Sequence, residues 1–389
     1  MKHARVAAKT AITSARRARL VEHGQRLRHG KYLCRCRPMP VPMDEGEGHG
    51  EVDVVELVAL CVALGERAGE ICRSVAFSGN LGAIDKGGDT DVRSGEYIAD
   101  VQTHADRRAE RLMTCAIRER FADVLVVAEE EAGGSHHTAS AIDGNDSFEG
   151  IPGYIMDAVR CAEWPRWLGC VKASRVCVYI DPLDGTGEFS RENYGVTTNL
   201  IGIAVDGRPV AGIINEPFLG HVKGEDLTAA RSRTVWGGPG AGVHGCTADC
   251  ACEPRTRTAC ANRVKDDRII PCLEAIGIPQ QEVSWVSASG FNLLQVLLGN
   301  RALYLVTRKG TKKWDTCAGT ALIEAKGGKV TDVLGREYVY GIHPDGDMNL
   351  CGILASLDPE LHAASVTHVQ RVCAPWPLDV ADASIFDST

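Results

Sequence analysis

The sequence predicts an α/β fold, because segments with helical spacing of apolar residues alternate with short runs of strand length. Apolar residues recur at close to helical spacing from Val52 to Ile71 and again from Asp106 to Phe121. Short apolar runs follow at 124–127 and 176–180, as expected for buried strands. This alternation is typical of a protein in which helices and sheets form separate layers.

The composition is that of an ordinary globular protein. Hydrophobic residues make up 44% and charged residues 24% of the 389 residues, enough for two modest domains or one large layered one. The formal net charge is −8, and the acidic residues concentrate after residue 43. An acidic body argues against binding to a nucleic-acid polymer and suits carboxylates placed around divalent cations. We find no apolar run near 18 residues, so we expect no membrane partner.

The first 50 residues differ from the rest, since an Arg-rich stretch is followed by prolines and by a Gly/Glu-rich run. We expect 1–50 to be a disordered or targeting extension. A cytoplasmic location is expected, with mitochondrial import through 1–37 as the alternative, and translation starting at Met43 is a further possibility.

The body is expected to divide into two subdomains and a tail. An N-terminal α+β metal-binding subdomain spans 51–216, a C-terminal α/β subdomain spans 217–370, and 371–389 form the tail. Residues at about 132–172 lack periodicity and are expected to be an insertion or lid between two strands. The other expected elements are strands at 197–204, 209–214, 302–306 and 352–355 and helices at 291–298 and 316–325.

Acidic residues follow two of these strands and precede one helix. Glu129 follows the strand at 124–127, Asp181 and Asp184 follow the strand at 176–180, and Asp315 precedes the helix at 316–325. Strand ends in an α/β protein converge on one rim, and Mg²⁺ prefers oxygen ligands. We therefore expect a magnesium site in which Asp181 bridges two cations, with the Leu183 carbonyl, left free by Pro182, as a further ligand.

The residues after this segment suggest phosphate chemistry. Gly185 and Thr186 open a turn or helix whose N–H groups can hold a substrate phosphate. Asp106 is placed to accept a hydrogen bond from Thr186, and the pair would orient and deprotonate the attacking water. Taken singly, each feature also fits a capped turn, a solvated loop or a helix N-cap, and the combination favours catalysis.

Three motifs carry a family resemblance: Glu129-Glu130, DPLDGT at 181–186 and WDTCAG at 314–319. In this order they resemble the inositol monophosphatase superfamily of lithium-sensitive phosphatases, and the resemblance runs from about Val52 to Ser356. It implies an αβαβα sandwich, the metal ligands Glu129, Asp181, Leu183, Asp184 and Asp315, and the water-activating pair Asp106 and Thr186.

Further stretches, at 100–112, 200–218, 234–238, 312–318 and 327–332, resemble the 3′(2′),5′-bisphosphate nucleotidase branch. This resemblance implies Mg²⁺-dependent removal of the 3′ phosphate of adenosine 3′,5′-bisphosphate, giving AMP and phosphate. Inositol polyphosphate 1-phosphatase is the alternative within the superfamily. A catalytically weak, metal-dependent ligand-binding protein is the alternative of a different class, but such a protein has no need of a water-activating pair.

The chain departs from the nucleotidase pattern where the substrate would bind. Ala259 and Cys260 stand where the branch has Ser and His, and Asn292 stands where it has Lys. Cations that would compensate are Lys309, Lys312 and Lys313, which also fit a solvated basic loop. The expected partner is a small phosphate ester, and the oligomeric state is left open.

Overall fold

The computed structural model describes residues 50–87, 89–90, 97–132, 146–246, 256–263, 266–341 and 346–373. The extension expected at 1–50 falls outside this set except for Gly50, and the tail expected at 371–389 falls outside it after Cys373. All statements below concern the described residues.

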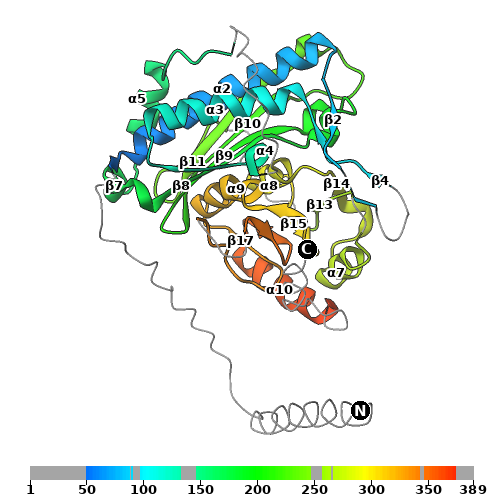
Figure 1. The fold of residues 1–389 in the computed structure, drawn as a ribbon. Helices are drawn as coiled ribbons and strands as arrows, with labels where there is room; N and C mark the ends of the chain where they lie inside the picture. Colours follow the sequence, from blue (N-terminus) through cyan, green and yellow to red (C-terminus); the bar gives the residue numbers. More distant parts are fainter. Residues whose placement is uncertain are drawn as a thin grey trace, which may run out of the picture. The chain divides into compact units, whose positions relative to one another are not determined.

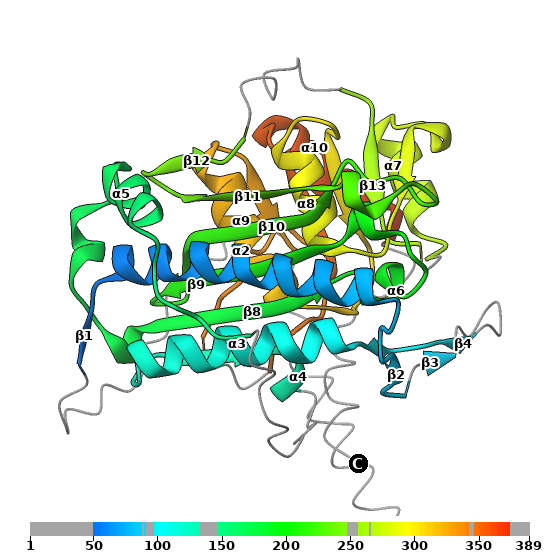
Figure 2. The ribbon, with the colours of Figure 1, turned by 90° about the horizontal axis from the view of Figure 1, so that it is seen from above.

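A six-stranded sheet forms the first β layer (Figures 1 and 2), and only its β6–β8 pair is parallel. Helices α2 (Val54–Ser78) and α3 (His104–Arg120) pack on one face. In spatial order the strands are β12 (Gly242–His244), β11 (Arg231–Gly238), β10 (Arg208–Leu219), β9 (Thr198–Val205), β8 (Val176–Asp184) and β6 (Leu125–Ala128).

A second, five-stranded sheet forms the other β layer. Its order is β14 (Val283–Trp285), β13 (Ala259–Ala261), β15 (Leu303–Val306), β19 (Ile353–Ser356) and β17 (Lys329–Thr331). Helices α8 (Ser289–Leu297) and α9 (Lys313–Ala325) contact both sheets and lie between them, while α10 (Pro359–Cys373) covers the outer face together with α7 (Ile269–Ile276). The αβαβα sandwich implied by the family resemblance is therefore confirmed.

Short elements complete the described chain. They are β1 (Glu51–Val52), β2 (Ile84–Asp85), β3 (Asp89–Thr90), β4 (Tyr97–Ile98), β5 (Val101–Gln102), α4 (Glu129–Ala132), α5 (Gly153–Cys161), β7 (Val171–Lys172), α6 (Thr186–Phe189), β16 (Thr311–Lys312) and β18 (Met348–Asn349). No helix in the described ranges is long and apolar enough to cross a membrane.

Two of the expected boundaries differ from the structure. The division expected at 216/217 falls inside β10, and the first sheet continues to His244 because β11 pairs with β10 and β12 pairs with β11. Part of the expected insertion at 132–172 belongs to the core: α5 packs against α2, and its Ile155 and Val159 are buried in the N-terminal cluster. Residues 133–145 lie outside the described set.

A pair of glycines sets the height of α9 above the first sheet. Gly202 in β9 and Gly212 in β10 lie directly opposite each other in the antiparallel pair. A Cβ on Gly202 would lie 2.5 Å from Cys317 Cβ, and one on Gly212 would lie 2.1 Å from the Ala318 carbonyl oxygen. Both distances are far below van der Waals contact, so the backbone of α9 rests on the sheet only because these positions have no side chain.

Candidate metal and phosphate site

A bulge in β8 brings Asp181 and Asp184 to one side of the sheet. In a regular strand two residues three positions apart point to opposite faces. The pairing of β8 with β9 shifts register between Asp181 and Asp184, where Pro182 cannot donate to the ladder. As a result, one carboxylate oxygen of each residue can meet an oxygen of Asp315, and the three atoms lie within 4.8 Å of one another.

Asp184 joins the first sheet to the start of α8. Its Oδ1 accepts the backbone N–H of Ser289 at 2.8 Å, and its Oδ2 accepts those of Gly290 and Phe291 at 2.9 and 3.2 Å. Oδ2 also accepts the Thr198 hydroxyl at 3.0 Å. A carboxylate offers about four lone-pair sites, so Oδ1 retains the capacity to bind a cation while Oδ2 is fully used.

Asp315 lies in the first turn of α9. The helix begins at Lys313, three residues earlier than expected, so Asp315 is not the residue just before the helix. Its Oδ2 accepts the backbone N–H of Lys312 at 2.6 Å. The backbone of α9 packs directly on Gly202 and Gly212, and this contact sets the distance between Asp315 and Asp181.

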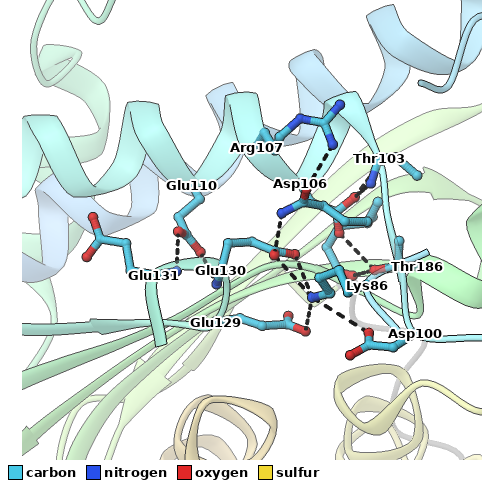
Figure 3. Close-up of polar contacts among 12 residues, drawn as sticks. Lys86, Asp100, Thr103, Asp106, Arg107, Glu110, Glu129, Glu130, Glu131 and Thr186 are labelled. Atoms are coloured by element: carbon cyan, nitrogen blue, oxygen red, sulfur yellow. Dashed lines mark hydrogen bonds and ion pairs between the residues drawn. The ribbon is translucent and has the colours of Figure 1, made fainter. Parts of the chain in front are cut away.

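Glu129 stands outside this trio of aspartates and interacts with a lysine instead (Figure 3). Lys86 Nζ lies 3.9 Å from Glu129, 3.1 Å from Glu130 and 3.6 Å from Asp100. Burial would lower the pKa of Lys86, but the surrounding carboxylates, Glu129 first, raise it above its ordinary value. Lys86 therefore stays protonated and ties the segment after β2 to the strand end that carries Glu129.

A second carboxylate holds the turn that presents Glu129. Glu110 in α3 accepts the backbone N–H groups of Glu130 and Glu131 at 2.8 and 3.1 Å, at the start of α4 (Figure 3). Buried Glu130 also accepts a hydrogen bond from Gln102. Sequence reasoning missed Lys86, Gln102 and Glu110, because each acts through a partner 20 or more positions away and none belongs to a local motif.

Asp106 and Thr186 are joined by a hydrogen bond (Figure 3). The Thr186 hydroxyl lies 2.8 Å from Asp106 Oδ1 and also 2.8 Å from the Leu183 carbonyl oxygen, and it can donate to either. The other oxygen of Asp106 accepts the backbone N–H of Thr103 at 2.7 Å and the Thr103 hydroxyl, which completes a capping box at the start of α3. Asp106 is thus fixed by a helix cap on one side and faces Thr186 on the other.

Of the carboxylates of the site, Asp106, Asp181 and Asp184 are buried and Glu129 and Asp315 are half-buried. Burial raises the pKa of Asp106 to about 6 and that of Asp184 to about 7. Burial, together with neighbouring carboxylates, also raises the pKa values of Glu129 and Asp181, and burial raises that of Asp315. Like charges gathered in a low-dielectric site favour a bound divalent cation, and the all-oxygen donor set fits a hard one such as Mg²⁺.

Gly185 connects the metal-site strand to α6 in a backbone conformation that favours glycine. Its φ is +84°, and an added Cβ would lie 3.0 Å from Ala288 Cβ, just before α8. A glycine at this position therefore permits both the positive φ of the turn and the close approach of α8 to the site. The phosphate contact expected at Gly185 and Thr186 stays a prediction.

The positions expected to contact a nucleotide are part of the core. Ala259, Cys260 and Asn292 each have 0% relative exposure. Cys260 Sγ faces the carbonyl oxygens of Asn292 and Leu303, and Asn292 Nδ2 donates to the Val286 carbonyl at 2.8 Å. None of the three side chains can touch a ligand in this arrangement.

The three candidate lysines differ in exposure. Lys309 is exposed, Lys312 is half-buried with its ammonium 5.6 Å from the ring centroid of Trp314, and Lys313 is buried. Their role in binding an anion stays a prediction.

Residues 53–373 match the inositol monophosphatase family, which covers most of the chain and all of the site described above. The chain belongs to this family. Among its relatives is the mouse protein 3′(2′),5′-bisphosphate nucleotidase 1, 29% identical over 313 residues that cover 78% of this chain and 91% of the relative. Putative inositol monophosphatase 3 of Drosophila melanogaster is 29% identical over 310 residues, covering 79% of each. The chain is accordingly a phosphatase.

Solved structures show the same fold. Inositol monophosphatase from Anabaena (Nostoc) superposes with a TM-score of 0.51 at 18% sequence identity, covering 85% of this chain and 100% of that one. The family as a whole acts on small phosphate esters, in line with the acidic cluster of Asp181, Asp184 and Asp315.

Proposed function

We propose that the chain is a Mg²⁺-dependent phosphomonoesterase that removes the 3′ phosphate of adenosine 3′,5′-bisphosphate, giving AMP and phosphate. The observation that carries this proposal is the hydrogen bond between Thr186 and Asp106 beside the trio Asp181, Asp184 and Asp315. A protein that only binds a ligand has no use for a hydroxyl aimed at a buried carboxylate next to a cation site.

The cation would be held by the free oxygens of Asp181, Asp184 and Asp315, with Glu129 and the Leu183 carbonyl as further ligands. When bound, it supplies positive charge to the phosphate oxygens and lowers the pKa of the attacking water. Asp184 would bind through Oδ1, because its other oxygen already accepts three hydrogen bonds.

Asp106 and Thr186 would accept the proton of the attacking water. With its hydrogen directed to Asp106 Oδ1, the Thr186 oxygen offers a lone pair to a water at the mouth of the site. That contact would orient the water, and its proton would pass through the Thr186 hydroxyl to Asp106 as the new phosphorus–oxygen bond forms and the phosphorus–oxygen bond to the ester oxygen breaks. The leaving 3′ oxygen would take up a proton from solvent. The capping box keeps the second oxygen of Asp106 engaged, so Oδ1 stays directed at Thr186.

The choice of substrate follows the nucleotidase relatives, which share 27–29% of their residues with this chain over 78–79% of its length. An inositol phosphate is the second candidate. It is favoured by the burial of Ala259, Cys260 and Asn292, since these positions offer nothing to a nucleotide.

The test is phosphate release from a panel of four compounds: adenosine 3′,5′-bisphosphate, inositol 1,4-bisphosphate, inositol 1-phosphate and fructose 1,6-bisphosphate. Each is assayed with Mg²⁺, with Ca²⁺ and with excess chelator. We expect the highest kcat/KM for the adenosine compound, saturation with Mg²⁺, and inhibition by Ca²⁺, which prefers looser coordination. Lithium inhibition is expected from the family resemblance. Full activity in chelator would exclude the metal mechanism, and a preference for an inositol compound would reassign the substrate.

A further inference from the structure

The leaving group of the substrate, which keeps the second phosphate, must be recognised by residues other than Ala259, Cys260 and Asn292. Ala259 and Asn292 are in the core, so no side chain at either position reaches a ligand. A candidate cation lies just beyond them, at the carboxyl end of β13. This end is where ligands bind in α/β folds, because several parallel strands finish there.

Arg263 is that cation, and its backbone and side chain are both anchored. Its backbone N–H donates to Ser287 Oγ at 3.1 Å, and its Nε donates to the Trp285 carbonyl at 3.1 Å. Nε also lies 3.1 Å from Oε1 of Glu188. The side chain is 49% exposed, and within the described ranges its two terminal nitrogens have no hydrogen-bond partner.

These anchors place Arg263 beside the metal and phosphate site. Glu188 belongs to α6, two residues after Thr186. Ser287 lies two residues before Ser289, whose backbone N–H binds Asp184. Arg263 therefore contacts both segments that flank the carboxylate cluster, and Figure 2 shows α6 at the same end of the molecule as β13.

A second guanidinium, that of Arg191, lies close to α6. Arg191 Nη1 donates to the Gly187 carbonyl at 2.9 Å, and it lies 3.3 Å from the point where a Cβ of residue 187 would stand. Because Gly187 has no side chain, the guanidinium of Arg191 occupies that space. Arg263 thus pairs with the buried carboxylate of Glu188, while the guanidinium of Arg191 is held by a backbone carbonyl.

We propose that Arg263 binds the second phosphate of a bisphosphorylated substrate, with Arg191 adding to the positive field. This inference rests on the proposed function and names the residue that recognises the leaving group. A guanidinium held at Nε presents its two terminal nitrogens as a planar fork, which matches two oxygens of a phosphate. With a substrate that has a single phosphate, the two terminal nitrogens of Arg263 would stay hydrated and make no contact with the substrate.

The experiment compares two substrates that differ only by the second phosphate: adenosine 3′,5′-bisphosphate and adenosine 3′-monophosphate. Arg263→Gln should lower kcat/KM for the bisphosphate about 10- to 100-fold, the range expected for lost hydrogen bonds between charged groups. The value for the monophosphate should stay within about twofold, which also shows that the variant is folded. Arg263→Lys should recover part of the loss, because it restores the charge without the fork. Arg175→Gln is the matched control. Arg175 directly precedes the first residue of β8, at the opposite end of the strand from Asp181 and Asp184, and pairs there with Asp206.

Each outcome decides between the two proposals. If Arg263→Gln lowers kcat/KM equally for both substrates, or lowers it for neither, the role of Arg263 is overturned. The proposed phosphatase activity is not contradicted by either result. A wild-type chain inactive on every compound of the panel would refute the proposed function itself. If the wild type prefers inositol 1,4-bisphosphate, the comparison is made against inositol 1-phosphate, and Arg263→Gln should again affect only the bisphosphate.

Discussion

The substitution Gly212→Ala tests whether the packing of α9 sets the geometry of the metal site. Gly212 lies in β10 directly under the backbone of α9, and a Cβ there would lie 2.1 Å from the Ala318 carbonyl oxygen. The atom that this Cβ would clash with belongs to the backbone, so a change of side-chain rotamer cannot relieve the clash. Since non-bonded contacts are optimal near ~3.5 Å, α9 must move away from the sheet by roughly 1 Å or more.

The displacement reaches the site because Asp315 lies one helical turn before Ala318 in α9. Its carboxylate would move away from Asp181 and Asp184, which belong to the sheet. A misplacement of about 1 Å can cost ~10²-fold in rate, and overpacking costs about 1–3 kcal/mol of unfolding free energy. We expect Gly212→Ala to lower kcat by about that factor, to raise the Mg²⁺ concentration for half-maximal activity, and to lower the unfolding free energy within that range.

The assay measures kcat, Mg²⁺ half-saturation and urea unfolding for the variant beside a matched glycine substitution. Gly153→Ala is the control, because a Cβ at Gly153 meets nothing within 4 Å and the residue starts helix α5 on the surface. It should match the wild type in all three measurements. A Gly212→Ala enzyme with wild-type kcat and Mg²⁺ dependence would show that the site does not depend on how closely α9 approaches the sheet.

Three further predictions concern the carboxylates. Asp181→Asn should nearly abolish turnover while Asp157→Asn, at an exposed position of α5, should change kcat less than twofold; equal effects would mean that other carboxylates bind the metal. Asp106→Asn and Thr186→Ala should each lower kcat ~10²–10⁴-fold with little change in Mg²⁺ half-saturation, and the double variant should be scarcely worse; losses that multiply would separate their roles. In excess chelator the unfolding free energy should rise as the pH falls from about 8 to about 6, because the folded-state pKa values of Asp106 and Asp184, about 6 and about 7, exceed those of the unfolded chain. Saturating Mg²⁺ should remove that slope in thermal or urea titrations, and a slope of opposite sign would contradict the raised pKa values.

Local patterns were enough to predict the elements and the motif residues. The helical spacing after Val52 led to α2, although the helix begins two residues later, where Asp53 caps it by accepting the N–H groups of Val55 and Glu56. The alternation of helices and strands indicated the layered class, and the motifs indicated the family. These features depend on residues close together in the chain, so they can be read without knowing which segments meet.

The tertiary structure decided everything that depends on distant segments meeting. The ion pairs of Lys86 with Glu129 and Glu130 join positions more than 40 residues apart. The place of Asp315 depends on Gly212, about 100 residues earlier, because steric contact between β10 and α9 sets the distance between them. Burial of Cys260 likewise arises from packing between β13 and α8, which no local pattern records. A sequence therefore shows which groups are available for chemistry, while their positions and exposure follow from contacts that form only when the layers pack.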